Sequence, residues 1–516
     1  MRPALLLLLL CSCEPTKAVI DGNVGDTPAT GDSAAGADTG EPGHDDPDPL
    51  EVALTGTAVF DPVLGDGASW TLTATEGATV SAVVTDGAGG VVRALADGAE
   101  AVDALSWDGR DEAGALVEAG TYTVVATAAR GEEAPVEARA EVGLVRLGLS
   151  AGTLSGEDRV PLLWHRGGSG DGGGGRYYVQ EDEEVTFALS ALVDEAGAPV
   201  AVARPWDDLD RVPEDFADQN MPAAYPYDAT PTLKLSFGGQ VGGVPVTAEI
   251  EGWTAVSAQV TDGAELVFER ATPLAEGPGV VEETLSVTFS ADGQPVASVE
   301  VPLRIYALLG PPTFDSAESP YYPWVAVIDP ALRDMAGVAP TEEAVTAALV
   351  DYIFNDLGLS YDTRYGASAY MSYGRGWDSA RFNMSGFLSR SSGDVVNCSD
   401  CAGILTAHAN MLGAYLGQSI IQPSFSLNYI LAIGGDDFTH CPFGGSSCGF
   451  SYHAVTSPDG SDTIYDATLA LDGDADPGSE PNEVLMVSDI TGEEYLDRLV
   501  MSGSPNLYSY GTGELQ

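Results

Sequence analysis

The chain has 516 residues, with 78 acidic side chains against 21 basic ones and a formal net charge of −57. So acidic a surface repels phosphate groups, which excludes nucleic acids and anionic membrane surfaces as binding partners. It suits a protein kept soluble in salty or extracellular surroundings, or it is simply typical of the protein's source. The length allows three or four domains, each with a core of its own.

Residues 1–13 indicate an export signal. Arg2 precedes an apolar run from Leu5 to Leu10, far shorter than the ~20 residues that span a bilayer. The following Leu-Cys-Ser-Cys resembles a bacterial lipobox, which implies that Cys13 is lipidated and that Cys11 is removed with the signal. A plain secretory signal is the alternative. Either interpretation predicts an extracytoplasmic protein, and the first predicts a cell-envelope protein that meets the membrane only through its lipid anchor.

Residues 14–50 are rich in Asp, Gly, Thr, Ala and Pro and contain almost no large apolar side chain. Such a segment cannot bury a core, so we expect a disordered acidic linker.

Residues 51–148 have an all-β pattern. Apolar and polar residues alternate over Thr79–Val84, and Gly-containing turns separate the runs. The segments Ser106–Gly114, with its Trp-Asp-Gly turn, and Ala119–Val124 resemble the Ig-like module of the flagellar hook-cap protein FlgD. The resemblance implies an Ig-like sandwich that acts as a spacer or interaction module, with no flagellar role.

Residues 149–310 are also β-rich. Strand patterns such as Thr232–Phe237, Leu285–Phe289 and Val296–Tyr306 alternate with Gly- and Pro-rich loops, among them 167–175. They predict a second β-sandwich and indicate no function.

The last segment, residues 311–516, begins with a Pro- and aromatic-rich stretch. Thr341 then has the features of a helix N-cap, and Val345 and Leu349 begin the apolar stripe of an amphipathic helix. A loop rich in Gly, Tyr and Ser follows. Its aromatic residues could line a substrate groove or pack within their own domain: Tyr370, Tyr373, Trp377 and Phe382.

The segment from Val396 to Gly413 predicts a loop that leads into a helix with one buried apolar face. That face is formed by residues at helical spacing, namely Ala402, Leu405, Ala409, Leu412 and Leu416. Cys398 lies at the front edge of the helix, beside residue types that favour helix starts. The helix dipole and unpaired N–H groups there favour a thiolate and could hold an oxyanion.

Downstream, a turn signal at Pro458-Asp459-Gly460 separates two strand patterns. We expect a β-hairpin with His453 on one arm and Asp466 on the other. A thiol, an imidazole and a carboxylate in this order suit nucleophilic acyl transfer, in which Cys398 attacks, His453 moves the proton and Asp466 orients the imidazole.

With these residues in place, the C-terminal segment resembles the transglutaminase-like superfamily, whose fold is similar to that of papain-type cysteine proteases. The resemblance rests on Cys398-Ser-Asp-Cys-Ala, His453-Ala-Val and Asp466-Ala-Thr, and it covers residues 341–471. It implies an α+β domain, so the predicted architecture is two all-β Ig-like sandwiches followed by an α+β transglutaminase-like domain. Cys401 stands where the family has an aromatic residue, and Val455 where it has tryptophan, which puts the substrate preference in question.

Other interpretations of these cysteines stay open. Cys398 and Cys401 have C-x-x-C spacing, which could form a redox pair, a structural disulfide or half of a zinc site that includes His408 or His440. His408, however, falls on the helical stripe of Cys401, so a core histidine is the simpler account. Cys441 and Cys448 bracket a short loop, and we expect a disulfide between them in an oxidising compartment.

A weak calcium motif follows the hairpin. Asp472, Asp474, Asp476 and Glu483 occupy positions one, three, five and twelve of an EF-hand-like loop, but Pro477 replaces the usual glycine. An acidic surface loop is the first interpretation and a calcium site the second; no other cofactor is expected.

We therefore expect an exported thiol enzyme that acts on amide bonds in a peptide, protein or peptidoglycan substrate. The sequence does not decide between hydrolysis and acyl transfer to an amine. The alternative is a non-catalytic adhesion or scaffold lipoprotein at the cell surface, whose β modules carry the role.

Overall fold

The computed structural model describes residues 48–516 apart from 101, 167–175, 180–183, 189–221, 315–321, 374–379, 445–447, 475, 477–480, 512–513 and 516. The predictions for the signal, for Cys13, for linker residues 14–47, for the 167–175 loop and for Trp377 fall outside the described residues.

The first described domain is a sandwich of a three-stranded sheet, β1-β3-β6, and a five-stranded sheet, β2-β8-β7-β4-β5. Trp107 is buried between the two sheets, with its ring centroid 5.5 Å from that of Phe60 and 5.1 Å from that of Tyr122. The Trp-Asp-Gly segment is therefore core packing followed by a turn, in which Gly109 has φ +75°. The strands are β1 Val52–Gly56, β2 Val59–Phe60, β3 Ala68–Ala74, β4 Thr79–Thr85, β5 Val91–Glu100, β6 Ala104–Trp107, β7 Gly120–Ala129 and β8 Val136–Leu144.

The second domain is a sandwich of two five-stranded sheets, β12-β9-β14-β18-β16 and β13-β20-β19-β15-β17. Its longest element is the β19–β20 hairpin, in which every second residue is buried along much of β19. The strands are β9 Leu149–Ser155, β12 Glu184–Ala188, β13 Ala223–Pro226, β14 Thr232–Phe237, β15 Val246–Ile250, β16 Trp253–Ser257, β17 Gln259–Val260, β18 Glu265–Arg270, β19 Gly279–Ala291 and β20 Gln294–Leu308; β10 Leu163–Arg166 and β11 Arg176–Val179 form a separate pair.

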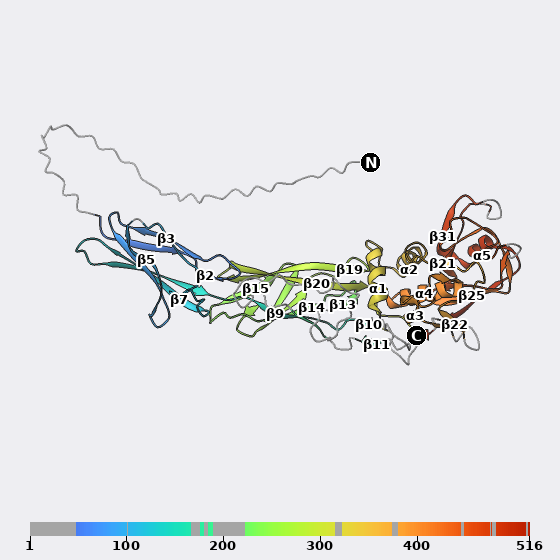
Figure 1. Cartoon of the computed structure of the whole chain (residues 1–516), viewed down its shortest axis with the longest axis horizontal. Helices are drawn as coiled ribbons and strands as arrows, with labels where there is room; N and C mark the ends of the chain where they lie inside the picture. The colour runs from blue at the N-terminus through green and yellow to red at the C-terminus, as the bar shows by residue number, and fades with distance from the viewer. Residues whose placement is uncertain are drawn as a thin grey trace, which may run out of the picture. The chain divides into compact units, whose positions relative to one another are not determined.

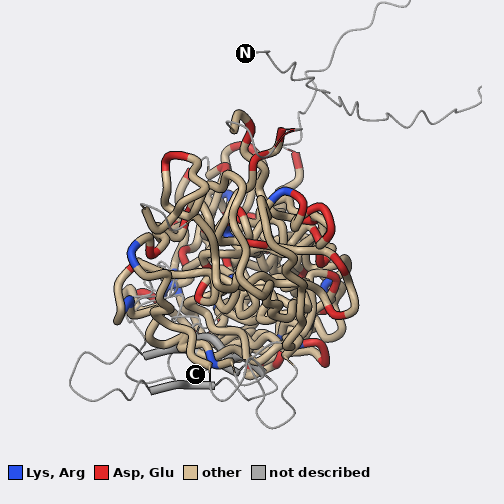
Figure 2. The backbone as a smooth tube through the Cα atoms, turned by 90° about the vertical axis from the view of Figure 1, so that its right-hand side faces the viewer, with Lys and Arg blue, Asp and Glu red and all other residues tan. Residues whose placement is uncertain are grey.

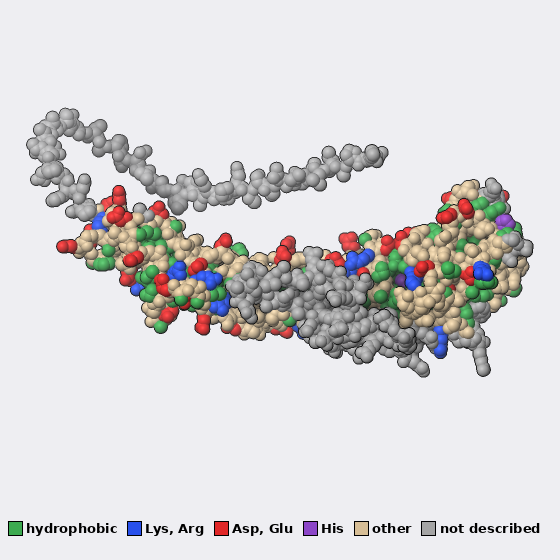
Figure 3. Space-filling view, viewed as in Figure 1, with side chains coloured by type: hydrophobic (Ala, Val, Ile, Leu, Met, Phe, Trp, Pro, Cys, Tyr) green, Lys and Arg blue, Asp and Glu red, His purple; other side chains and the backbone are tan. Residues whose placement is uncertain are grey.

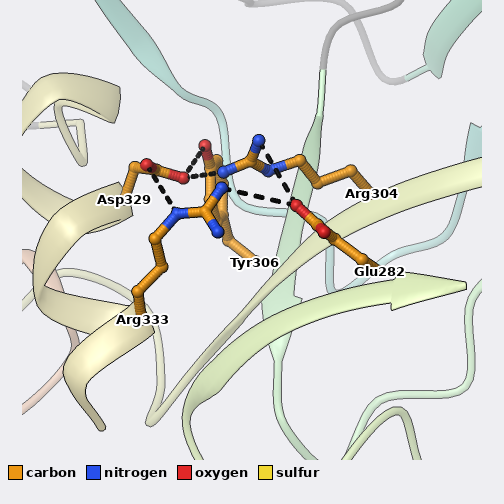
Figure 4. A network of polar contacts seen from close by, with 5 residues as sticks. All are labelled: Glu282, Arg304, Tyr306, Asp329 and Arg333. Atoms are coloured by element: carbon orange, nitrogen blue, oxygen red, sulfur yellow. Dashed lines mark hydrogen bonds and ion pairs between the residues drawn. The ribbon is translucent and has the colours of Figure 1, made fainter. Parts of the chain in front are cut away.

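Strand β20 also belongs to the core that follows it. Tyr306 and Leu308, near its end, pack in the same hydrophobic cluster as helix α1, Val325–Asp334. Arg304, only 1% exposed in its side chain, is hydrogen-bonded to Asp329 of α1, and the Tyr306 hydroxyl donates to the same carboxylate at 2.9 Å. Arg333 of α1 joins Asp329 to Glu282 of β19, which closes the network shown in Figure 4.

Residues after 310 contain all five α-helices of the described chain, around a central sheet ordered β27-β30-β29-β25-β33, with β31 also paired to β30 (Figure 1). The helices are α1, α2 Glu342–Asp351, α3 Met384–Leu388, α4 Cys398–Met411 and α5 Gly492–Leu499; a π-helical turn, Tyr352–Asp356, extends α2. The strands are β21 Ser360–Tyr361, β22 Met371–Tyr373, β23 Ala380–Phe382, β24 Val395–Val396, β25 Gly417–Gln422, β26 Phe425–Leu427, β27 Ile430–Ala432, β28 Gly449–Phe450, β29 His453–Ser457, β30 Thr463–Asp472, β31 Val484–Thr491, β32 Val500–Ser502, β33 Asn506–Gly511 and β34 Glu514–Leu515. The protein is thus multidomain and mostly β.

Helix α2 begins as the sequence predicts. Thr341 is its N-cap, and the threonine hydroxyl accepts the Ala344 N–H at 3.2 Å. Val345 and Leu349 are buried against the sheet. Helix α1 was not predicted, because Pro330 lies inside it and proline removes a helical hydrogen bond. Its buried face against β20 and α4 compensates for that loss.

Helix α4 differs from its prediction in two ways. Every residue of the helix is buried, polar ones included, rather than one apolar face. The helix also ends at Met411, and Gly413 follows at φ +89°, so Leu412 and Leu416 lie beyond it. The helix packs on β29 and β30 and is the central element of the C-terminal core.

The acidic composition is visible in the folded chain. Acidic positions far outnumber basic ones along the backbone in Figure 2, and acidic side chains are spread over the described parts of the face in Figure 3. Among the described residues, no helix is both long enough and apolar enough to cross a bilayer.

Candidate active site

Cys398 is the first residue of α4 and is 4% exposed. Asn397 caps the helix: its side-chain oxygen accepts the Asp400 N–H at 3.0 Å, while the Asp400 carboxylate accepts the Asn397 N–H at 3.1 Å. Within the described part of the chain, neither the Cys398 nor the Ser399 backbone N–H has an acceptor. Two unpaired N–H groups therefore lie beside the thiol, at the positive end of the helix.

The Asp400 carboxylate holds the loop that precedes the site. One oxygen, Oδ1, accepts the Ser368 hydroxyl at 2.7 Å and the N–H groups of Tyr370 and Met371 at 2.8 and 2.7 Å. Oδ2 accepts the Ala369 N–H at 2.7 Å as well as the helix cap. Asp400 is fully buried, so these donors take the place of water around its charge. The sequence motif contains Asp400, but its partners are about thirty residues away and carry no local signal.

His453 lies at the start of β29, and its imidazole is fully buried. Its Nε2 atom is 2.8 Å from Oδ2 of Asp466, on the neighbouring strand β30. The ring stacks on Phe450, with centroids 5.1 Å apart and an interplanar angle of 11°. The strands form the expected hairpin, with Thr456 opposite Tyr465 and Gly460 at φ +68° in the turn.

The other ring nitrogen of His453, Nδ1, is buried and has no partner at ideal hydrogen-bond geometry in the described structure. No hydrogen bond joins Nδ1 to the Cys398 thiol in the described structure, although Cys398 is an electrostatic neighbour of the ring. Hydrogen bonds in an active site are often long before substrate binds. The structure thus joins His453 to Asp466 by a hydrogen bond, with Cys398 acting on the same imidazole.

Burial alone would lower the pKa of His453, but the Asp466 charge and hydrogen bond, followed by Cys398, outweigh it and raise the pKa to about 10. The imidazolium form is therefore the stable one at neutral pH. The histidine stabilises the folded chain fully below its ordinary pKa of 6.5, and that contribution is lost as the pH rises towards 10.

Asp466 is fixed by more than the histidine. Its Oδ1 accepts the Thr468 N–H at 2.7 Å, and its Oδ2 accepts the Tyr495 hydroxyl at 2.7 Å. Tyr495 lies on α5 and is fully buried. No pattern in the sequence pointed to Tyr495, because a tyrosine in a short helix has no chemical signature of its own.

Several tyrosines lie near Cys398. The Tyr452 hydroxyl is 3.1 Å from the Ser399 hydroxyl, and Tyr452 and Tyr510 pack on the small cluster that contains Cys398. Burial raises the pKa of Tyr373 and of Tyr361, so both phenols stay neutral. Of the predicted groove aromatics, Tyr370 and Phe382 are buried and belong to the domain core.

Cys398 and Cys401 are both free thiols, so the C-x-x-C pair forms no disulfide here. Cys401 is completely buried, and burial raises the pKa of its thiol well above the ordinary value. His408 is also buried; its Nδ1 lies 2.7 Å from the Ile404 carbonyl, and burial lowers the pKa of the ring to about 4. His408 is thus a neutral core histidine hydrogen-bonded within its own helix.

Cys441 and Cys448 are joined by a disulfide. Within the loop they close, Phe443 contacts Phe450, with ring centroids 5.8 Å apart. Phe450 in turn stacks on His453, so the disulfide loop is connected to the imidazole by the contacts of two aromatic rings, Phe443 and Phe450. His440 lies within 4.8 Å of both cysteine sulfurs, but those sulfurs are bonded to each other and cannot serve as thiolate ligands in this state.

The candidate calcium residues do not gather into a metal-binding group among the described residues. Asp474 accepts hydrogen bonds from the Asp476 N–H and the Asn482 amide, and the Arg498 guanidinium donates to the carbonyls of Asp472 and Asp474. An arginine cation therefore already contacts this loop, and calcium binding stays a prediction.

Comparison with known proteins bears on the N-terminal part. The family model described as the FlgD Ig-like domain matches residues 61–132. The first sandwich is similar to that domain. A solved structure titled "Chimeric titin Z1Z2 functionalized with a KLER exogenous peptide from decorin" is 9% identical, covers 50% of this chain and 97% of that chain, and has a TM-score of 0.15, too low to inform the fold. No curated protein matches the chain.

Proposed function

We propose that the protein is a thiol enzyme that acts on amide bonds, with Cys398 as nucleophile, His453 as proton carrier and Asp466 as the group that orients it. The observation that carries the proposal is the buried hydrogen bond between His453 and Asp466. It is supported by Cys398, which is an electrostatic neighbour of the same imidazole and begins α4 beside two unpaired N–H groups. The arrangement favours an α+β domain of the transglutaminase-like type over an inert binding fold.

In the proposed reaction the Cys398 thiolate attacks the amide carbonyl carbon, and a carbon–sulfur bond forms as the carbonyl electrons move to oxygen. The N–H groups of Cys398 and Ser399 are placed to hold this oxyanion. The imidazolium of His453 then gives its proton to the leaving nitrogen, the carbon–nitrogen bond breaks, and a thioester remains.

The neutral imidazole next takes a proton from water or from an amine, whose attack on the thioester releases a carboxylic acid or a new amide and restores the thiol–histidine pair. Water is the default acceptor, so we propose hydrolysis of a peptide or peptidoglycan amide, with no cofactor. Asp466 stabilises the imidazolium and holds the ring in place throughout.

The proposed location is the cell envelope, with the chain anchored by lipid on Cys13 and held away from the membrane by residues 14–50. Several acyl chains on Cys13 would be needed for a firm anchor, since one chain binds only marginally. Mass spectrometry of the mature protein tests this: an intact Met1 or an unmodified amine at another cleavage site would refute it.

The test of the triad is the alkylation of the intact, unreduced protein by iodoacetamide, followed by peptide mapping. Cys398 should label rapidly at neutral pH, and His453→Ala should slow the labelling by at least tenfold. His440→Ala is the matched control, because His440 is half-buried and its ring contacts Tyr429 rather than Cys398.

Asp466→Ala should lower turnover while leaving Cys398 open to alkylation. Slow, equal labelling of Cys398 in the natural and His453→Ala chains would refute the enzyme proposal and favour the alternative, a scaffold lipoprotein whose β domains carry the function.

A further inference from the structure

The Asp466 carboxylate receives three hydrogen bonds from three different elements. His453 of β29 and Tyr495 of α5 share one oxygen, at 2.8 and 2.7 Å, and the Thr468 N–H takes the other at 2.7 Å. Asp466 is 1% exposed and Tyr495 is completely buried, so water does not compete for these bonds.

We infer that Tyr495 is a positioning residue of the same site, in addition to Cys398, His453 and Asp466. Its hydroxyl holds the Asp466 carboxylate in place and weakens the electrostatic attraction between this carboxylate and the His453 imidazolium. The inference rests on the proposed function. The histidine and the Thr468 N–H already hold the two carboxylate oxygens. The Tyr495 hydroxyl, brought in by α5, adds a third hydrogen bond that restrains the group further.

The hydroxyl also affects the charge that the histidine feels. Burial, then Asp466, raises the pKa of Tyr495 well above its usual value, so the phenol is protonated at neutral pH and donates to Oδ2. The Tyr495 hydroxyl donates to Oδ2, the same oxygen that contacts Nε2 of His453. Like any hydrogen bond to a carboxylate, it stabilises the negative charge and so weakens the effect of that charge on the imidazole. Tyr495 therefore keeps His453 a weaker base than Asp466 alone would make it.

Other ionisable groups act on this cluster from the remaining elements. The electrostatic neighbours of Asp466 include Cys401 of α4 and Tyr361 of β21, and Cys398 acts on both Tyr495 and His453. Burial keeps Cys401 and Tyr361 uncharged, so of these neighbours only Cys398, whose alkylation is followed in the same experiment, can change its charge together with the Asp466–His453 pair.

The test is Tyr495→Phe in the full chain, with two measurements: the rate of Cys398 alkylation against pH, and the titration of His453 followed by NMR with isotope-labelled histidine. Loss of this hydrogen bond, which the neutral phenol donates to the carboxylate, should move the His453 titration, and the upper inflection of the alkylation profile, upward by about 0.5 to 1 pH unit. Tyr465→Phe is the matched control, because Tyr465 is equally buried on β30 but makes no hydrogen bond to Asp466. It should leave both curves unchanged.

A second variant separates positioning from general packing. In an Asp466→Asn background, Tyr495→Phe should cause no further shift, because its effect passes through the carboxylate. An equal shift in both backgrounds would overturn the inference, as would a folded Tyr495→Phe chain whose titration matches the natural one. A failure of the proposed function gives a different result from both of these outcomes. Cys398 of the natural chain would then be unreactive, but the NMR titration would still show the effect of Tyr495 on the pKa of His453.

Discussion

Asp400→Asn tests the side chain near Cys398 that accepts five hydrogen bonds. The change keeps the size of the side chain but replaces one acceptor oxygen with an NH2 group. In the better of its two orientations the amide oxygen keeps the three donors of Oδ1, and the NH2 group faces the N–H groups of Ala369 and Asn397. Two charge-assisted hydrogen bonds are then lost and two buried donors are unpaired.

Each such bond contributes about 1.5 to 3 kcal/mol, so the free energy of unfolding should fall by ~3–6 kcal/mol. The matched control is Asp362→Asn. Asp362 accepts the N–H groups of Arg364, Tyr365 and Ala367, but in a more exposed loop where water can replace the lost bonds. We expect the control to lose less than about 1 kcal/mol.

Hydrogen–deuterium exchange in increasing urea, read by mass spectrometry, assigns the loss to a segment in this multidomain chain, where a single spectroscopic transition would not. Peptides from α4 and from residues 368–371 should lose protection at lower urea in Asp400→Asn than in the control. Equal midpoints for the two variants would refute the claim that buried donors around Asp400 hold the start of α4.

Three further predictions follow from the site. Between pH 6.5 and about 4 the unfolded chain binds a proton at His408 that the folded chain does not, so the free energy of unfolding should fall by ~3 kcal/mol as the pH drops through that range, and the fall should be smaller in His408→Leu. Replacing Cys441 and Cys448 with serine should change overall stability little, because the closed loop is short, but should speed amide exchange in β29; unchanged exchange there would contradict the aromatic contact. Cys401→Ala should leave the labelling of Cys398 intact, since its thiol is buried in the core, whereas loss of activity in this variant alone would mean that the nucleophile was misassigned.

The parts of the site that the sequence predicted are those with local signals. Asn397 and Asp400 flank Cys398 in a pattern typical of a helix start, and a turn separates the strands of His453 and Asp466. Short-range rules of capping and hairpin formation were enough to place these three functional groups on their elements.

The parts that it did not predict depend on distant partners. Tyr495 is 29 residues from Asp466, and the loop donors of Asp400 are 29 to 32 residues away. Periodicity also failed for α4, because several of its polar residues are buried with hydrogen-bond partners inside the fold. The Asn410 amide, for example, donates to the Thr406 carbonyl at 2.7 Å, so it needs no solvent.

The sharing of β20 between two cores limits how the chain can be divided. A shortened chain that begins at residue 311 would lack Tyr306 and Leu308 from its own core and would leave Asp329 without Arg304. The part that contains Cys398, His453 and Asp466 therefore cannot be cut out, transferred to another protein or released by proteolysis at that point without losing stability. A shortened chain that contains only this C-terminal part has to retain the β19–β20 hairpin, from Gly279 onward. The apolar residues of the hairpin that pack in the core of the second sandwich would then be exposed and would need other residues to bury them.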